Sequence, residues 1–503
     1  MVRHSNDASE LWKNIPWRKL RKNIFRLQCR LWKAIRANDR KRALSLQKLI
    51  LKSRSCRLLA IRQVTQLNAG KKTAGIDGKA GLSFSERLEL EETLRLNVQE
   101  WKHSKLREIP IPKKDGTTRI LKVPNICDQA WQCLVKYALE PAHEATFNPR
   151  SYGFRPGRSA HDCQKFAYLN LSSSANGITK RILKLDIEKC FDTIDQPFLM
   201  SRIIAPQSIK TGIWKCLKSG INPNYPDQGT PQAGVVSPLL ANIALDGIEE
   251  IHPSLRYAAS MVFFLKPNDN AQLILDKITK FLVIRGLNVK ASKTRLVSAT
   301  DGFDFLGWRF VVQKNGKLYT YPSMDNYKAF RAQVKFIVNN SNYGARVKAE
   351  KLSPIVRGWR NYHRYCKMDG SRFSLWYLSN RTFKVFNKES KINRYEAQTL
   401  VKNAFPAVPY SENKHINVKG DYSPFNGDIV YWSQRESKYD DGTTAKALKK
   451  QNHTCGNCGL KFVGDERIHL HHINGIHSDG NAKNFVAIHQ SCHQYHHMSK
   501  SRS

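Results

Sequence analysis

Two pairs of metal-binding residues near the C-terminus restrict the fold of this chain more than any other feature of its sequence. The pairs have the spacings Cys-x-x-Cys and His-x-x-Cys, and their members are Cys455, Cys458, His489 and Cys492. Two such pairs are typical of a tetrahedral structural zinc site, which holds together a module too small to build a large core. The sequence therefore predicts a Zn²⁺-stabilised module over residues 451–503. Because cysteine is commoner at the position of His489, His496 is an alternative ligand.

The charge balance points to a polyanionic partner. The 503 residues include 83 Lys and Arg against 41 Asp and Glu, a formal net charge of +42. A solubilising surface needs far less excess charge, whereas a chain that binds nucleic acid uses it to neutralise phosphates. Basic residues are dense over residues 1–60, where apolar residues recur at roughly helical spacing. We expect basic amphipathic helices there that contact a nucleic-acid backbone.

The sequence gives no indication of a membrane or secretory role. It has no apolar run of membrane-spanning length and no signal-peptide pattern. The cysteines outside the two pairs follow no disulfide framework spacing, so we expect reduced thiols in the core. These features predict a cytoplasmic protein without a membrane partner.

Hydrophobic periodicity predicts an α+β chain of several domains. The expected strands are at 107–112, 118–123, 182–187 and 257–265. A helix is expected near 127–140, and the pattern between 309 and 405 is helical and basic. Residues 406–450 are rich in turn-forming residues, which indicates a linker or a small irregular domain.

Asp186 ends one of the apolar strands and is a candidate ligand for catalytic metal ions. Nucleotidyl transfer requires carboxylates that hold two Mg²⁺ ions, which activate the attacking 3′-hydroxyl and stabilise the leaving pyrophosphate. A single carboxylate cannot hold both ions. A second strand must therefore supply further acidic residues if this chain is a polymerase.

A series of motifs runs in a fixed order through most of the chain. The motifs are IPIPK at 109–113, FNPRSYGFRP at 147–156, the strand that ends at Asp186, GTPQA at 229–233, SPLLAN at 237–242, FLGW at 305–308, SPIVRGWRNY at 353–362 and SPFNGD at 423–428. Together they resemble group II intron-encoded proteins, the reverse transcriptase/maturase family. By this resemblance the partner is a group II intron RNA, which performs the splicing chemistry itself.

The resemblance also implies a domain order. The expected domains are a basic N-terminal helical extension (1–60), right-hand-like reverse transcriptase fingers and palm (61–315), a helical thumb/maturase domain (316–408), a small DNA-binding region or linker (409–450) and a zinc-stabilised ββα HNH endonuclease module (451–503).

The second carboxylate strand departs from the family. The family reads Tyr-Ala-Asp-Asp where this chain reads Tyr257-Ala258-Ala259-Ser260, and neither Ala259 nor Ser260 can bind a hard cation as a carboxylate does. Asp269, beyond a proline, is poorly placed to substitute. We therefore expect no DNA polymerisation. The remnant of the polymerase site comprises Asp186, Phe191 (by resemblance the sugar-selecting aromatic), Ala259 and Ser260, and Ala233 replaces a glycine of the family.

A right-hand-like polymerase fold keeps its basic groove even when it holds no catalytic metal ions. The residues expected to contact phosphates are Lys113, Lys114, Arg119, Arg150, Arg155 and Arg158, with Arg357 and Arg360 in the maturase-like region. In that region aromatic and guanidinium groups that can stack on unpaired bases alternate at Trp359, Tyr362, Arg364 and Tyr365. The helical spacing fits core packing of Trp359 equally well.

Between and after the metal-binding pairs, the order His-His, Asn, Cys-His resembles the HNH nuclease motif. The resemblance assigns a divalent metal, Mg²⁺ or Mn²⁺, to His471, His493 and His497. His472 is then the general base, and Asn484 fixes the loop that orients it. His469 and His477 receive no role and are expected at the surface. A zinc-stabilised binding finger without nuclease activity is the alternative.

These features predict a group II intron maturase without polymerase activity. It is expected to bind intron RNA, promote its folding and splicing, and form a ribonucleoprotein for retrohoming. Residues 420–435 are expected to bring double-stranded target DNA to the HNH module, which cuts the strand opposite the RNA's insertion site. Two alternatives stay open: an RNA-binding splicing cofactor whose zinc finger is only structural, and an engineered inactive form of an active reverse transcriptase.

Overall fold

The structure is a computed structural model and describes most of the 503 residues. The described residues are 3–68, 72–112, 116, 118–220, 228–231, 233–370, 372–389, 391–436, 442–459, 462, 468–476, 479, 481–490 and 492–493. Within these ranges no helix is both long and apolar enough to cross a membrane.

Helices open the chain and pack around a buried helix. They are α1 (Arg3–Lys13), α2 (Trp17–Arg36), α3 (Arg40–Lys52), α4 (Arg54–Arg62) and α5 (Phe84–Asn97), and the buried helix is α6 (Ile126–Glu144). Among them α2, α3 and α4 are basic. Leu31, Ile50 and Ile61 are fully buried and share one core with Trp131 of α6. The helices expected in residues 1–60 are present, and their apolar faces belong to this core rather than to a separate arm.

Side-chain caps explain where several of these helices begin. Asp39 accepts a hydrogen bond from the backbone of Arg42 at the start of α3, and Ser53 does the same for α4. At α5, Ser83 and Glu86 form a capping box. Each cap satisfies backbone N–H groups that have no partner within the helix.

A hairpin and the palm sheet follow. The hairpin pairs β1 (Arg107–Pro112) with β2 (Thr118–Val123), as expected, and is largely exposed. The palm is a four-stranded antiparallel sheet whose order is β4 (Ser254–Tyr257), β5 (Ser260–Leu265), β3 (Arg181–Asp186) and β6 (Arg295–Ser298). The strand expected over 257–265 is thus the end of β4, a turn and β5.

The palm sheet is buried on both faces. Leu183 of β3 lies in the core that contains α6, whereas its neighbour Ile182 lies in a second core beneath the helices that follow the palm. Phe263 and Phe264 of β5 divide between the two cores in the same way. Alternate side chains of a strand point to opposite faces, so burial on both sides explains the continuous apolar run of β5.

Short helices surround the palm. They are α7 (Ala160–Leu171), α8 (Cys190–Thr193), α9 (Gln196–Arg202), α10 (Gln207–Ser219), α11 (Ser237–Leu245) and α12 (Ala271–Val283). Single turns of other helix types are η1 (Gln63–Leu67), η3 (Ser173–Ala175), η4 (Gly177–Thr179), η5 (Ile248–Glu250) and η6 (Ala291–Lys293).

A three-stranded sheet connects the palm to a helical domain. Its strands are β7 (Phe303–Phe305), β8 (Trp308–Val312) and β9 (Leu318–Pro322), and the helices are α13 (Met324–Val338), α14 (Ala345–Tyr362), α15 (Trp376–Phe386) and α16 (Arg394–Ala404). Leu306 and Gly307 form the tight turn before β8, with φ of 51° and 81°. The expectation of helix directly after Trp308 was wrong, because β9 alternates buried and half-buried side chains with a period of two.

The segment 405–436 packs on the body of the protein. It contains η7 (Pro424–Asn426) and α17 (Ile429–Glu436). Arg435 donates to Asp162 of α7 at 2.6 Å, and Asp421 pairs with Arg36 of α2. Phe425 and Trp432 are buried, so these two aromatic side chains anchor the segment instead of facing solvent.

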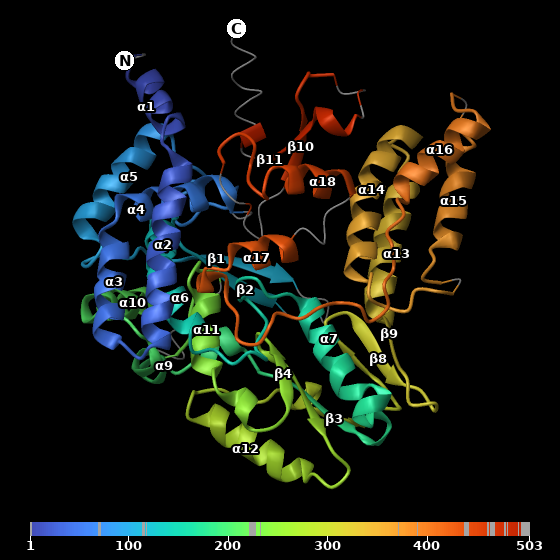
Figure 1. Ribbon diagram of the computed structural model, residues 1–503, viewed down its shortest axis with the longest axis horizontal. Helices are drawn as coiled ribbons and strands as arrows, with labels where there is room; N and C mark the ends of the chain where they lie inside the picture. The colour runs from blue at the N-terminus through green and yellow to red at the C-terminus, as the bar shows by residue number, and fades with distance from the viewer. Residues whose placement is uncertain are drawn as a thin grey trace.

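The chain ends in a small module built from α18 (Gly442–Lys450), β10 (Ile468–His472), η9 (Ala482–Asn484) and β11 (Phe485–His489). The two strands pair antiparallel, with His471 opposite Val486. Figure 1 shows the module in red at the top of the view, with the N-terminal helices on the left, α13–α16 on the right and the palm with α12 at the bottom.

Candidate functional site

The tip of the palm sheet brings Asp186 beside a turn without carboxylates. Asp186 ends β3 and lies directly opposite Ser260, the first residue of β5. The N–H of Ile187 donates to the carbonyl of Ala259 at 3.0 Å, which continues the pairing into the turn. Acidic side chains at positions 259 and 260 would stand next to that of Asp186. Ala259 and Ser260 supply none.

Close contacts from the loop before α7 hold the turn between β4 and β5 in place. A Cβ on Gly153 would lie 2.4 Å from the backbone nitrogen of Ala258, so only glycine allows this approach. Arg256 is buried at the end of β4 and donates to Glu249 at 2.5 Å and to Ser151 at 2.7 Å. Sequence reasoning missed the buried ion pair between Arg256 and Glu249. The hydrogen bond to Ser151 joins the palm to the loop before α7. The framework of the tip is therefore intact even though its acidic residues are missing.

A lysine neutralises the remaining carboxylate. Nζ of Lys293 lies 2.9 Å from Oδ2 of Asp186. Asp269 lies beyond the opposite end of β5, where it accepts from the N–H of Lys266 at 2.6 Å and faces His252 at 3.2 Å. Asp269 therefore does not reach the tip. One carboxylate paired with an ammonium group is a poor site for a pair of Mg²⁺ ions.

Two further positions that the resemblance singles out are Phe191 and Ala233. Phe191 is half-buried, and its ring meets that of Phe154 edge-on with 6.3 Å between centroids. The N–H of Ala233 donates to the carbonyl of Lys122 at 3.3 Å. Ala233 does not have a positive φ, so its Cβ introduces no backbone strain.

Arg155 does not face a groove as expected. Its side chain is 1% exposed, and Nε lies 2.7 Å from Oε1 of Glu144, which is equally buried. Its other donors reach Glu144 again and the carbonyls of Asn148 and Ser151. The expectation of a phosphate contact is corrected here, because the guanidinium is committed to a buried carboxylate and to backbone oxygens.

The other basic residues of the fingers and palm differ in accessibility. Arg158 donates to the carbonyl of Tyr422, and burial lowers its pKa to about 10. Arg150 donates to the carbonyl of Glu249 at 2.6 Å. Arg119 is exposed on β2. Lys113 and Lys114 lie outside the described residues.

In the helical domain, two arginines of α14 have different surroundings. Arg357 is exposed and lines a groove of about 500 Å³ between α14 and α16, with Arg346, Glu350 and Asn403 among the other lining residues. Arg360 donates to the carbonyls of Phe405 and Pro406 at 3.1 Å and 2.8 Å. Arg357 is therefore the more accessible cation, and Arg360 secures the start of the segment 405–436.

The aromatic residues of α14 are packed in the core. The ring of Trp359 stacks on Phe330 with centroids 4.6 Å apart, and its Nε1 donates to Asn326. Tyr362 stacks on Trp308 at 4.6 Å and donates its hydroxyl to the carbonyl of Leu306. Of the two possibilities left open for Trp359, the structure favours packing.

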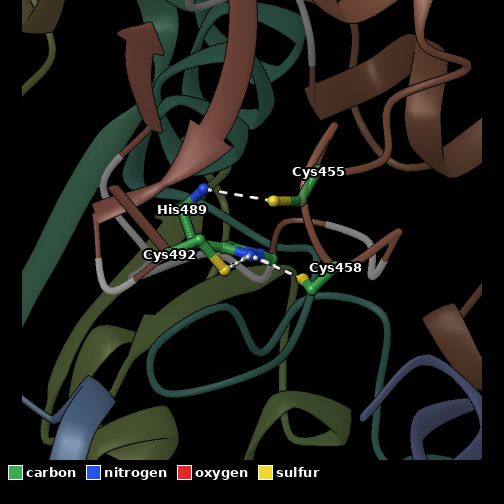
Figure 2. A group of neighbouring side chains, drawn as sticks. All are labelled: Cys455, Cys458, His489 and Cys492. Atoms are coloured by element: carbon green, nitrogen blue, oxygen red, sulfur yellow. Dashed lines mark hydrogen bonds between the residues drawn. The ribbon is translucent and has the colours of Figure 1, made fainter. Parts of the chain in front are cut away.

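The two metal-binding pairs of the C-terminal module meet. The ligand atoms of Cys455, Cys458, His489 and Cys492 all lie within 4.8 Å of one another. Figure 2 shows these four side chains gathered around a common point. Nδ1 of His489 lies 3.3 Å from Sγ of Cys458. Hydrogen bonds from Cys458 and Cys492 lower the pKa of the Cys455 thiol. Thiolate sulfurs and one imidazole are a donor set that suits Zn²⁺. His496 lies outside the described residues.

The neighbouring histidines line both faces of β10. His472 packs against the ring of Phe485 with centroids 4.8 Å apart. Asn484 accepts from the N–H of Asn474 at 3.0 Å and donates to the carbonyl of Asp479 at 3.2 Å, so it bridges the loop that follows His472. The ring of His493 lies 5.3 Å from that of His471. His497 lies outside the described residues.

Comparison with known proteins places these features in a family. Residues 12–94 match the family model for the N-terminal domain of reverse transcriptase, 111–310 match reverse transcriptase (RNA-dependent DNA polymerase), and 327–398 match the group II intron maturase-specific domain. The chain is 41% identical to Maturase-like protein 1 of Euglena gracilis over 414 residues, which are 80% of this chain and 90% of the relative. The chain belongs to the group II intron reverse transcriptase/maturase family.

Other members of the maturase family show weaker or shorter similarity. Maturase-like protein 1 of Euglena longa is 39% identical over 78% of this chain and 86% of its own length. The group II intron-encoded protein LtrA of Lactococcus lactis is 33% identical over 36% of this chain and 31% of its own length. The reverse transcriptase match in this maturase-family chain contains all of β3 to β7, and the maturase-specific match covers most of α13 and all of α14 and α15. The fold is thus that of a reverse transcriptase with a maturase domain attached.

Proposed function

We propose that this chain is a maturase that binds a group II intron RNA, promotes its folding and splicing, and does not polymerise DNA. The observation that carries the proposal is the combination of an intact reverse transcriptase and maturase framework with a palm tip that has one carboxylate. Asp186 is neutralised by Lys293, and Ala259 and Ser260 offer no metal ligand. The proposed division into domains follows the boundaries expected from the sequence.

The proposed RNA partner fits the charge of the molecule. A net charge of +42 favours binding to the phosphates of a nucleic acid, and Arg119 and Arg357 present cations on the exposed hairpin and on α14. Arg357 lines an open groove between α14 and α16. We propose these two side chains as phosphate contacts. Lys113 and Lys114 are also proposed as phosphate contacts, on the basis of the sequence alone.

The proposal extends to the C-terminal module as an HNH endonuclease for one strand of double-stranded DNA. The Cys–His quartet would bind a structural Zn²⁺. His471 and His493 would hold a divalent ion that stabilises the charge developing on the scissile phosphate and the leaving oxygen. His472 would remove the proton from the attacking water. Asn484 would fix the loop that positions His472.

The first test uses the protein bound to its intron RNA and a DNA duplex with each strand labelled separately, in Mg²⁺ or Mn²⁺. We expect the wild type to cut one strand and His472→Ala to cut neither, with splicing unchanged in both. If both proteins leave the DNA intact and still accelerate splicing, the chain is an RNA-binding cofactor with a structural zinc finger. A primer annealed to the same RNA tests the polymerase, and extension by the wild type would contradict the proposed loss.

A further inference from the structure

Two histidines of β10 face the same third histidine. His469 and His471 are two residues apart on the strand, so their side chains point to the same face, and His472 points to the other. The ring centroid of His493 lies 5.3 Å from that of His469 and 5.3 Å from that of His471. His469 was expected to be a surface residue without a role. It instead contacts the same ring as a proposed metal ligand.

The ring distances fit a shared metal ion. A metal–nitrogen bond is about 2.1 Å long, so the centroids of two imidazoles on one tetrahedral ion are about 5 Å apart. Both measured distances are close to this value. Among the described residues only the Cys–His quartet holds its ligand atoms within 4.8 Å, so the side chains of the three histidines must rotate to converge on an ion.

The quartet itself fixes the position of the third ring. Cys492 belongs to the quartet and is 4% exposed, and His493 is its direct neighbour in the chain. On the strand side, His489 of the quartet pairs with Ile468, the residue before His469. A metal bound to the quartet would therefore hold both halves of the histidine cluster in register. The three histidines are half-buried, which leaves a side of the cluster accessible to water and substrate.

We propose that His469, His471 and His493 form a three-nitrogen site for a divalent transition metal, with His469 as a ligand. The inference rests on the proposed nuclease function and specifies its metal site. Three imidazoles suit Zn²⁺, Co²⁺ or Ni²⁺ better than Mn²⁺, and Mg²⁺ least, because Mg²⁺ prefers oxygen ligands and retains its water. Cleavage by this module is accordingly better supported by Co²⁺ or Ni²⁺ than by Mn²⁺, and is weakest in Mg²⁺.

The test is a titration of the zinc-loaded full-length chain, bound to its RNA, with Co²⁺. Cobalt bound by nitrogen and oxygen ligands gives weak visible bands, whereas cobalt that replaces zinc in the quartet adds strong thiolate charge-transfer absorption. His469→Ala should weaken the nitrogen-type binding at least about tenfold, since one of its protein ligands is lost. His472→Ala on the opposite face is the matched control and should bind Co²⁺ as the wild type does. His469→Asp, which supplies an oxygen ligand, should recover part of the affinity.

The variants separate this inference from the proposed nuclease. If His471→Ala and His493→Ala lose Co²⁺ while His469→Ala binds it normally, His469 is not a ligand and the nuclease site survives with another ligand. If the wild type shows no nitrogen-type binding, both the three-histidine site and the metal-dependent nuclease fail. A normal zinc content and an unchanged circular dichroism spectrum in His469→Ala exclude loss of the fold as the cause.

Discussion

Nζ of Lys293 lies 2.9 Å from Oδ2 of Asp186, at the point of the palm where the second acidic strand carries Ala259 and Ser260. The ammonium group supplies positive charge to a carboxylate that has no acidic neighbour at positions 259 and 260. The pair therefore accounts for Asp186 at this place in the fold without a metal ion. It also indicates which substitutions should create a metal site.

The first prediction concerns polymerisation. The wild type should not extend a primer in Mg²⁺ or Mn²⁺, whereas the double substitution Ala259→Asp and Ser260→Asp should, because position 260 faces Asp186 and the turn is rigidly held. Restored metal binding should raise extension by about 10³-fold over background, roughly 4 kcal/mol of transition-state stabilisation. Gel analysis of labelled primers measures this. Lys293→Ala alone is the control, since it removes the ion pair without adding a ligand. Extension by that variant would contradict the assignment.

The second prediction concerns the buried ion pair between Arg155 and Glu144. Arg155→Ala leaves the Glu144 carboxylate buried without its counter-charge, so the free energy of unfolding should fall by about 3–5 kcal/mol. Urea denaturation monitored by tryptophan fluorescence measures this loss. Glu144→Gln with Arg155→Met, which removes both charges, should recover much of it. A wild-type stability in Arg155→Ala accompanied by weaker RNA binding would instead restore the phosphate contact expected from the sequence.

The third prediction compares two residues of α14. Arg357→Ala should leave the unfolding free energy within about 0.5 kcal/mol of wild type, since exposed positions contribute little. It should weaken RNA binding and reduce the slope of log K against log salt by about 1, as expected for one lost phosphate contact. Trp359→Ala should show the opposite behaviour and cost about 3–5 kcal/mol of stability, because it removes a buried ring stacked on Phe330.

The fourth prediction concerns acid sensitivity. Burial lowers the pKa of His161 to about 4 and that of His363 to about 3. The unfolded chain protonates these imidazoles near their ordinary pKa of about 6.5, so it binds more protons than the folded chain at lower pH. Stability should therefore be constant above about pH 6.5 and fall progressively toward pH 4. Urea midpoints measured between pH 7.5 and 4.5 test this. In His363→Gln the urea midpoint should depend less on pH than in the wild type. A variant whose midpoint falls with pH as steeply as that of the wild type would contradict the role of His363 in acid sensitivity.

The accuracy of sequence reasoning differed between these regions for physical reasons. The quartet follows from chain spacing, because two ligands with two residues between them can place both side chains on one ion, and its ligand atoms do converge. The apolar run of β5 likewise predicts a buried strand. The role of Arg155 could not be predicted, since a motif arginine has the same appearance whether it faces a phosphate or a buried Glu144. The approach of Lys293 to Asp186 depends on strand order, which periodicity does not contain.

The last prediction concerns removal of metal from the quartet. The module has small apolar clusters, centred on residues such as Leu448, Ala487 and Ile488, so its order should depend on an ion bound by the Cys–His set. Wild-type protein should contain one Zn²⁺ bound by the quartet in each chain, and Cys458→Ser should lose this ion. In limited proteolysis the variant should be cleaved after residue 436, while the body formed by the palm and α13–α16 stays intact and supports splicing. Cys216→Ser, which alters a buried thiol of the body, should retain its zinc. A module that resists protease after chelation would show that its fold does not require the metal.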